Sequence, residues 1–350
     1  MDTWFFSGFL LLIIIIVLYF LTIFLLYIRQ NPTIDTNPNI GGQSIVTHTY
    51  LGLRGDMGNQ IFQLACVIAS GMRSNASVVF PSRISSLPIV NLFDLTGFDW
   101  KDLTPDATFY EYDNYEEINI PDDGRIYDIS GYRQSYKYFT DYSVLIRQIF
   151  TPKKYIIDAV RKIVPSEYIA VHIRKGDYLK LIHKIPLLRE FRRCQLQYYK
   201  EGIRKLRAQY PDCPLLICTD SPNWVTPILS ELDPNAVLAP IIPDISPKFT
   251  DFVVLHQAKS IVMSNSTFSW WAAYLNPNRT IICPTPWWDP DGFIGTSIAL
   301  DGPYLHYPDW WLLDADTGVT IREPCSDIGE KHDSNHETLN IYRLVRGLLL

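Results

Sequence analysis

From residue 45 onward, short apolar runs alternate with longer amphipathic segments, and this alternation constrains the fold more than any other feature. Short apolar runs bounded by turn residues are typical of buried strands, and longer amphipathic runs are typical of helices. Strands are predicted at 45–53, 76–80, 168–173, 215–218, 236–238, 261–263 and 280–283, and helices at 60–73, 141–150, 153–164 and 195–209. This order predicts an α/β protein, with a strand–turn–helix–strand unit of a parallel sheet over residues 45–80 and a doubly wound half in the later part of the chain. Residues 84–140 are aromatic and acidic and give no clear period.

The first 30 residues contain the longest apolar run. No charge occurs between Thr3 and Ile28, and about 20 such residues span a bilayer as a helix. The run is too long and bulky for a cleavable signal, so we predict an uncleaved single-pass anchor; the alternative is a buried core helix. Arg29 is the nearest basic residue, and taken alone it would place the C-terminal part in the cytoplasm.

Composition narrows the class of protein. The 350 residues suffice for two halves with substantial cores, and a net charge of −6 argues against a general nucleic-acid surface. The six cysteines lack the paired short spacing of a zinc site. Cys66, Cys218 and Cys283 lie in apolar runs and are predicted to be buried thiols. Disulfides among the cysteines stay open if the domain is lumenal.

Three N-glycosylation sequons occur, at Asn75, Asn265 and Asn278. Asn265 lies inside a polar turn that we single out below as a candidate site. We expect glycans at Asn75 and Asn278 and none at Asn265.

The segment Ser264–Leu275, SNSTFSWWAAYL, joins an apolar run to an aromatic stretch through small polar residues. This pattern predicts a buried strand, a hydroxyl-rich turn and a helix. Hydroxyls and free N–H groups at a helix start suit a phosphate, although a Ser or Thr cap on a core helix has the same pattern.

Two other motifs follow predicted strands. GLRGDMGNQIF, Gly52–Phe62, repeats glycine at every third position, which allows a tight turn or a close approach to a ligand. In VHIRKGDY, Val171–Tyr178, Arg174 can grip a phosphate with two hydrogen bonds, and Lys175 adds a point charge. Asp177 suits a general base or an ion pair with its basic neighbours.

Taken together, and in the chain order GLRGDMGNQIF, VHIRKGDY and SNSTFSWWAAYL, the three motifs resemble those of the α-1,2-fucosyltransferase family, glycosyltransferase family 11. The similarity extends from about Thr49 to Trp288. It implies a GT-B-like fold with two Rossmann-like halves, and inverting transfer of L-fucose from GDP-fucose to the 2-hydroxyl of an acceptor galactose. It also implies no essential metal or other cofactor. The expected parts are an anchor at 1–30, a stem at 31–48, an acceptor-side half at 49–152, a GDP-fucose-binding half at 153–321 and a tail at 322–350.

The resemblance also assigns residues. It implies that Arg174 binds the donor diphosphate, that His172 lies at the nucleotide and that Asp251 recognises guanine. It implies further substrate contacts from Gly58, Asn59, Lys175, Asp220, Ser264, Ser266 and Thr267, with Asn59 at the fucose or bridging region and Asp220 supporting Arg174. Many members have a second arginine where this chain has Lys175, so no paired hydrogen bonds are assigned to that side chain.

Catalysis is expected to depend on Arg174, Asn59 and a base. Breaking the fucose–phosphate bond leaves negative charge on GDP, which Arg174, Lys175 and a helix start can neutralise without a metal. Asp177 is the first candidate for the base, and His183 and Asp56 are alternatives. An oxocarbenium-like sugar needs little help from a base, so a single indispensable base is not required.

Two other functions stay open at this point. One is a fucosyltransferase that acts on protein or on another glycan position. The other is a non-catalytic carbohydrate-binding membrane protein, in which exposed tryptophans would stack on sugars; the candidates are Trp287, Trp288, Trp310 and Trp311. Core packing explains these tryptophans equally well. The resemblance implies a type II Golgi membrane protein with a lumenal domain, against the single charge of Arg29.

Overall fold

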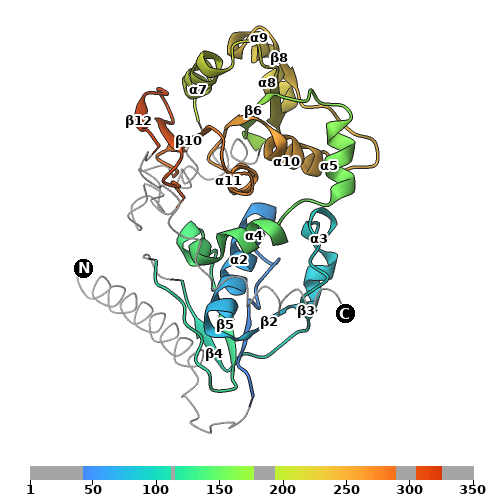
Figure 1. Ribbon diagram of the computed structural model, residues 1–350, viewed down its shortest axis with the longest axis vertical. Coiled ribbons are helices and arrows are strands. Elements are labelled where there is room, and N and C mark those ends of the chain that lie inside the picture. The colour runs from blue at the N-terminus through green and yellow to red at the C-terminus, as the bar shows by residue number, and fades with distance from the viewer. Residues whose placement is uncertain (1–41, 112–114, 177–193, 289–304, 325–350) are drawn as a thin grey trace, which may run out of the picture. The chain divides into compact units, whose positions relative to one another are not determined.

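A computed structural model describes residues 42–111, 115–176, 194–288 and 305–324 (Figure 1). The chain divides into two units, Met1–Gly41 and Gly42–Leu350, and only the second is described. The predicted anchor, most of the predicted stem and nearly all of the tail lie outside these ranges. No helix within them is long and apolar enough to cross a membrane.

The first sheet has the strand order β3-β2-β1-β5-β4, and every neighbouring pair in it is parallel. Its strands are β1 (Ile45–Thr47), β2 (Ser77–Phe80), β3 (Asp99–Trp100), β4 (Ala107–Phe109) and β5 (Ile126–Ile129). Helix α2 (Met57–Ser74) connects β1 to β2, and η1 (Ser82–Ser86) and α3 (Ile89–Leu92) follow β2. Asn75, in the left-handed conformation at φ 53°, ends α2.

The second sheet has the order β12-β11-β10-β9-β6-β7-β8. Its strands are β6 (Ile169–Ile173), β7 (Leu215–Thr219), β8 (Ala236–Leu238), β9 (Ser260–Val262), β10 (Ile281–Thr285), β11 (Trp311–Asp314) and the antiparallel edge strand β12 (Thr320–Arg322). Counted in chain order, the first six strands run 3-2-1-4-5-6, which is the Rossmann arrangement. The order reverses between β6 and β9, so a ligand crevice is expected beyond the carboxyl ends of those two strands.

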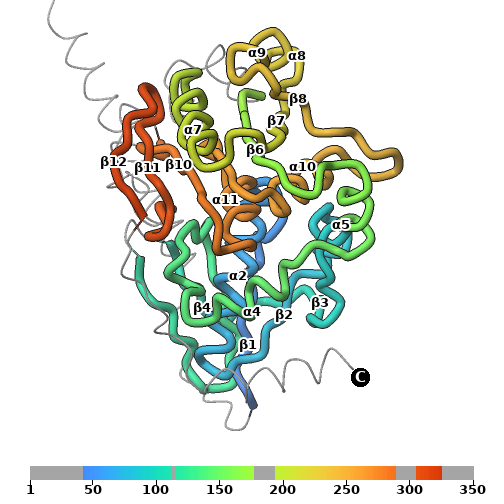
Figure 2. Tube along the Cα trace, turned by 45° about the horizontal axis from the view of Figure 1, so that its top comes forward, coloured from blue at the N-terminus to red at the C-terminus, as the bar shows by residue number. Residues whose placement is uncertain are grey.

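Helices cover both faces of the second sheet (Figure 2). Alternate residues of β6 point to opposite faces: Val171 packs in the core under α7 (Leu196–Gln209), while Ala170 belongs to the core under α10 (Pro247–Gln257) and α11 (Thr267–Tyr274). The other helices are η2 (Tyr136–Tyr142), α4 (Ser143–Ile149), α5 (Lys154–Arg161), α8 (Pro222–Val225), η3 (Thr226–Ile228) and α9 (Leu229–Leu232). The doubly wound prediction is thus confirmed for this sheet.

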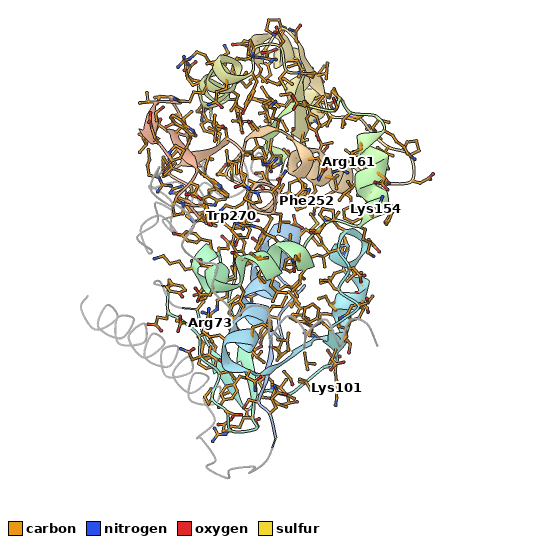
Figure 3. The ribbon with its side chains drawn as sticks, viewed as in Figure 1. Arg73, Lys101, Lys154, Arg161, Phe252 and Trp270 are labelled. Atoms are coloured by element: carbon orange, nitrogen blue, oxygen red, sulfur yellow. The ribbon has the colours of Figure 1, made fainter. Side chains whose placement is uncertain are left out.

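An aromatic cluster joins the two sheets where α11 contacts α2 (Figures 1 and 3). The ring centroids of Phe62 and Trp270 are 4.6 Å apart, and Phe139 stacks on Trp271 at 5.2 Å. Both tryptophans are fully buried, and the Trp270 indole N–H donates to the Leu305 carbonyl at 2.7 Å. The SNSTFSWWAAYL segment therefore ends in core packing that fixes its polar turn.

The secondary-structure predictions were confirmed with two kinds of exception. The strand expected over 45–53 ends at Thr47, because a turn with Gly52 and Gly55 at φ 81° and 78° follows it. The prediction missed β3, β4, β5, β11, β12, α3, α8, α9 and α10. The described cysteines, which exclude Cys325, are free, and Cys66, Cys218 and Cys283 are buried as expected.

Candidate active site

A cavity of about 400 Å³ opens at the switch point between β6 and β9. Arg174 directly follows β6, and residues 265–268 follow β9 and begin α11. The start of α2 lies opposite. The cavity is lined by Gly55, Asp56, Met57, Gly58, Asn59, Gln134, Arg174, Lys248, Asn265, Ser266, Thr267, Phe268, Trp287 and Trp288.

Three helices, α2, α10 and α11, begin at this cavity. The first N–H groups of a helix have no partner within it, and the aligned peptide dipoles make this end positive. Neither Asp56 nor Ser266, the N-cap residues of α2 and α11, caps its helix with its side chain. The predicted Ser cap on α11 is therefore present in position, but its hydroxyl is not used by the helix. These features make the cavity suited to an anion.

Arg174 is oriented by Asp220, as predicted. The Arg174 Nε lies 4.0 Å from Asp220 Oδ2, and Asp220 Oδ1 accepts hydrogen bonds from the backbone N–H of Lys175 at 3.0 Å and of Gly176 at 3.2 Å. Burial pushes the pKa of Asp220 upward, but these hydrogen bonds and the Arg174 charge hold it below its usual value. Asp220 thus stays ionised and holds the guanidinium at the cavity wall.

Lys175 takes a different direction from its neighbour. Its ammonium donates to the Cys194 carbonyl at 2.8 Å and lies 4.6 Å from the centre of the Trp224 ring, and the residue is 5% exposed. Lys175 is not among the residues that line the cavity, and its contact with substrate stays a prediction. The candidate bases Asp177 and His183 lie outside the described residues.

The three hydroxyl residues of the turn before α11 also differ in whether they reach the cavity. Ser266 and Thr267 line the cavity, whereas Ser264 is fully buried and its Oγ accepts a hydrogen bond from the Tyr199 hydroxyl at 3.2 Å. Of the three predicted hydroxyls, two are therefore placed where a ligand can reach them. Ser264 instead supports the turn from behind.

The three sequons differ in exposure. Asn265 is only 4% exposed, and its amide donates to the Trp287 carbonyl at 3.2 Å. Asn75 and Asn278 are exposed. This arrangement supports the predicted choice of sites, and glycosylation itself stays a prediction.

Asn59 connects the two sheets at the cavity. Its Oδ1 accepts hydrogen bonds from the Gln134 amide at 2.8 Å and from the Thr267 hydroxyl at 3.1 Å. Gly58 allows this approach, because a Cβ at that position would lie 2.5 Å from the Thr267 carbonyl carbon. Gly58 and Asn59 are thus brought together with Arg174, as predicted.

His172 and Asp251 lie behind the cavity wall. The His172 ring is 5.4 Å from Phe268, and burial together with the Arg174 charge lowers its pKa to about 3, so the ring is neutral. Its Nδ1 is buried and has no hydrogen-bond partner within the described part of the chain. Burial raises the pKa of Asp251, on α10, to about 7. His172 can therefore serve a nucleotide only as an uncharged polar contact, whereas Asp251 gains or loses its proton near neutral pH.

The family model for glycosyl transferase family 11 matches residues 48–300. The chain belongs to this family. It is 26% identical to an alpha-1,2-colitosyltransferase of Escherichia coli, over 68% of this chain and 91% of that protein, and 23% identical to galactoside alpha-(1,2)-fucosyltransferase 2 of Pongo pygmaeus, over 77% and 80%. The protein is thus an enzyme, a glycosyltransferase of the fucosyltransferase class, and the prediction of a non-catalytic protein as an alternative was wrong.

Two solved structures resemble this family 11 enzyme at low sequence identity. POFUT1 in complex with GDP-fucose matches with a TM-score of 0.43 and 13% identity, covering 69% of this chain and 95% of POFUT1. Fucosyltransferase NodZ from Bradyrhizobium matches with a TM-score of 0.41 and 17% identity, covering 66% and 93%.

Sequence reasoning missed several residues of the family 11 cavity, above all Gln134, Lys248 and Phe268. Lys248 lies in the first turn of α10 and forms an ion pair with Asp56 at 3.9 Å. The dipeptide Ser246-Pro247, a common helix start, was an available signal for this turn. No motif near Gln134 indicates a site residue, because Gln134 lies within residues 84–140, where the hydrophobic pattern has no clear period.

The expectation of metal independence overlooks two Asp-x-Asp triplets in the sequence, a pattern compatible with a metal site. Residues 289–291 lie outside the described ranges. In residues 314–316, Asp314 Oδ1 accepts hydrogen bonds from the Asp316 and Thr317 N–H groups and from the Thr317 hydroxyl, which closes a turn at the end of β11. No cluster of three metal-ligating side chains occurs among the described residues. Metal independence stays a prediction.

Proposed function

We propose that this enzyme has a GT-B-like fold and is a galactoside 2-α-L-fucosyltransferase. It would transfer L-fucose from GDP-fucose to the 2-hydroxyl of a terminal galactose, with inversion at the anomeric carbon. One observation carries the proposal: Arg174 and the starts of three helices line one cavity at the switch point of a Rossmann sheet. Such a cavity suits a nucleotide diphosphate.

The donor would be held by its charge and by its base. Arg174, the helix N–H groups and the hydroxyls of Ser266 and Thr267 would bind the diphosphate. The unpaired Nδ1 of His172 would gain a partner on the nucleotide, and Asp251 would accept hydrogen bonds from guanine. In this arrangement the described residues supply the positive charge that a metal supplies elsewhere.

The transfer step exchanges one bond for another. The galactose O2 forms a bond to the fucose anomeric carbon as the bond from that carbon to the GDP oxygen breaks. The departing oxygen keeps the electron pair, and Arg174 stabilises its charge. The proton of the 2-hydroxyl passes to a base, for which Asp177 stays the first candidate; Asp56 is the candidate that lines the cavity.

A second donor deserves a parallel test because the relative from Escherichia coli is named a colitosyltransferase. Colitose is fucose without the 3-hydroxyl. A cavity that hydrogen-bonds this hydroxyl would reject colitose, since its buried polar groups would be left unpaired. The ratio of kcat/KM for the two sugars therefore identifies the donor.

The test is a transfer assay with purified protein. GDP-fucose and GDP-colitose are each offered with a β-galactoside, an N-acetylglucosaminide and a serine- or threonine-containing peptide, and the linkage of the product is read by NMR. We expect an α-1,2-linked fucosyl galactoside, formed equally well in the presence of EDTA. Transfer to the peptide alone, or to a hydroxyl other than O2, would overturn the proposed acceptor.

We further propose a type II membrane protein of the Golgi, anchored by residues 1–30, with its catalytic domain in the lumen and glycans at Asn75 and Asn278. Support comes from the uncharged apolar run and from the exposure of both asparagines. Protease protection of the catalytic domain in intact microsomes, lost on adding detergent, is the expected result. Digestion in intact microsomes would contradict it.

A further inference from the structure

The loop Ser130–Gln134, which follows β5, has an unusual backbone. Gly131 has a φ of 102° and Arg133 a φ of 52°, and Arg133 is a buried residue. A residue other than glycine in the left-handed region costs free energy, and such residues persist where surrounding contacts hold them.

A dense set of hydrogen bonds holds this loop. The Glu111 carboxylate accepts from the backbone N–H of Tyr132 at 2.6 Å and of Arg133 at 2.7 Å. The Arg133 guanidinium donates to the carbonyls of Ser130 at 2.7 Å and Phe109 at 2.6 Å. The Gly131 carbonyl lies 2.9 Å from His48 Nε2 and accepts from the Gln63 amide at 3.3 Å. The loop backbone is therefore held by side chains from three other segments of the chain and by the loop's own Arg133 side chain.

This fixed loop presents two side chains to the cavity region. Gln134 lines the cavity and donates to Asn59. Tyr132 is 41% exposed, and a Cβ placed on Gly55, which lines the cavity, would lie 3.0 Å from its Cε1. The Tyr132 ring thus stands at the rim of the cavity without lining it.

Other exposed apolar side chains share this edge of the first sheet. Tyr50 and Leu53 follow β1, and Tyr110 follows β4; they are 54%, 60% and 47% exposed. β1, β4 and β5 are parallel and adjacent, so their carboxyl ends lie at one edge. The rim at this edge is rich in exposed aromatic side chains, with the charged Arg54 and Asp56 exposed beside them, whereas the wall across the cavity carries Arg174.

We propose that Tyr132 is a platform for the sugar that precedes the reacting galactose in the acceptor. This inference rests on the proposed function. One face of a pyranose carries C–H bonds whose weak positive charge packs on the negative face of an aromatic ring. Because Tyr132 lies outside the cavity lining, the ring meets the part of the acceptor that protrudes from the cavity and leaves the galactose itself to Asn59 and its neighbours.

The test compares two acceptors in the full protein. Methyl β-galactoside ends at the reacting sugar, whereas lactose carries a second one. We expect Tyr132→Ala to raise the KM for lactose about fivefold to tenfold, and to change the KM for methyl β-galactoside and for GDP-fucose less than about twofold. Tyr132→Phe should retain the lactose KM. Tyr155→Ala, at a 60% exposed tyrosine of α5, is the matched control and should change none of these constants.

The outcomes separate this inference from the function on which it rests. If the unaltered protein transfers fucose to neither galactoside, both fail. If it does so but Tyr132→Ala raises the KM for both acceptors equally, or for neither, the platform alone is overturned. Should Tyr132→Ala fail to fold by circular dichroism, Tyr132→Phe and Tyr132→Leu decide: equal lactose KM values in these two variants overturn the platform, and a raised value in the leucine variant supports it.

Discussion

Two sheet edges meet at the cavity, and they differ in chemistry. The edge of the second sheet carries Arg174, held by an ionised Asp220, together with the hydroxyls of Ser266 and Thr267. The edge of the first sheet carries the amides of Asn59 and Gln134 and an exposed aromatic rim. Under the proposed function, a charged diphosphate and an uncharged sugar call for different surfaces, so this difference would assign the donor to the second sheet and the acceptor to the first.

The largest effect should come from removing the charge of Arg174, at the edge of the second sheet. We expect Arg174→Ala to lower kcat about 10²- to 10³-fold, because the developing charge on GDP loses its main donor. Steady-state kinetics on the folded variant measure this. Arg204→Ala, at an ion-paired but 70% exposed arginine, is the control and should be fully active. An Arg174→Ala variant with more than a tenth of normal turnover would show that this edge does not drive the reaction.

A smaller effect is expected from forcing the two edges apart. In Gly58→Ala the added methyl would meet the Thr267 backbone at 2.5 Å, where no flexible side chain can yield. We expect a loss of about 1–3 kcal/mol in the free energy of unfolding, measured by urea denaturation, and a parallel loss of turnover. The helical Ala65→Gly, at a buried position about two turns further along α2, gives a comparison in which the helix is weakened without an added methyl group. Unchanged activity in Gly58→Ala would mean that the edges need not be in contact.

The smallest effect concerns the protonation of Asp251 and its influence on the affinity for GDP-fucose. Asp251 has a pKa raised to about 7 by burial, and it must be ionised to accept two hydrogen bonds from guanine. Below pH 7 binding must first remove a proton, so the affinity falls as the pH falls. Between pH 8 and pH 6 we expect Kd for GDP-fucose to rise about tenfold. Calorimetric titration at both pH values measures it, and Asp251→Asn should bind weakly but equally at both. A tenfold change that persists in Asp251→Asn would assign the proton to another group.

Much of the fold follows from sequence because the longer helices α2 and α7 are amphipathic and the buried strands of the second sheet are short apolar runs. The strands β3, β4 and β5 have two to four residues each, and such short elements are stabilised by partners distant in sequence rather than by local pattern. The loops after β4 and β5 nevertheless carry Tyr110, Tyr132 and Gln134. The edge of the first sheet at the cavity was therefore the part least predictable from the sequence.

The sequence predicted which residue types belong to the site, but not which of their side chains point into the cavity. Arg174 and Lys175 are both cationic and adjacent, yet only Arg174 reaches the cavity, because successive side chains at a strand end point to opposite sides. Ser264 and Ser266 also differ in direction: Ser264 is buried and Ser266 lines the cavity, because the φ and ψ angles of the turn aim them differently. Gln134 was missed because only the fold of the loop after β5 brings it to Asn59.

The convergence of three helix starts on one cavity has a consequence for the lifetime of the enzyme. The positive ends of these helices share the cavity with Arg174 and Lys248, whose charges Asp220 and Asp56 partly offset, and bringing the remaining positive charge together costs folding free energy. Under the proposed function a bound nucleotide diphosphate would offset this cost, and at a hundred times its Kd any ligand of the folded state adds about 2.7 kcal/mol of stability. A cell that depletes its pool of nucleotide sugar would therefore also lower the fraction of this enzyme that stays folded and escapes proteolysis.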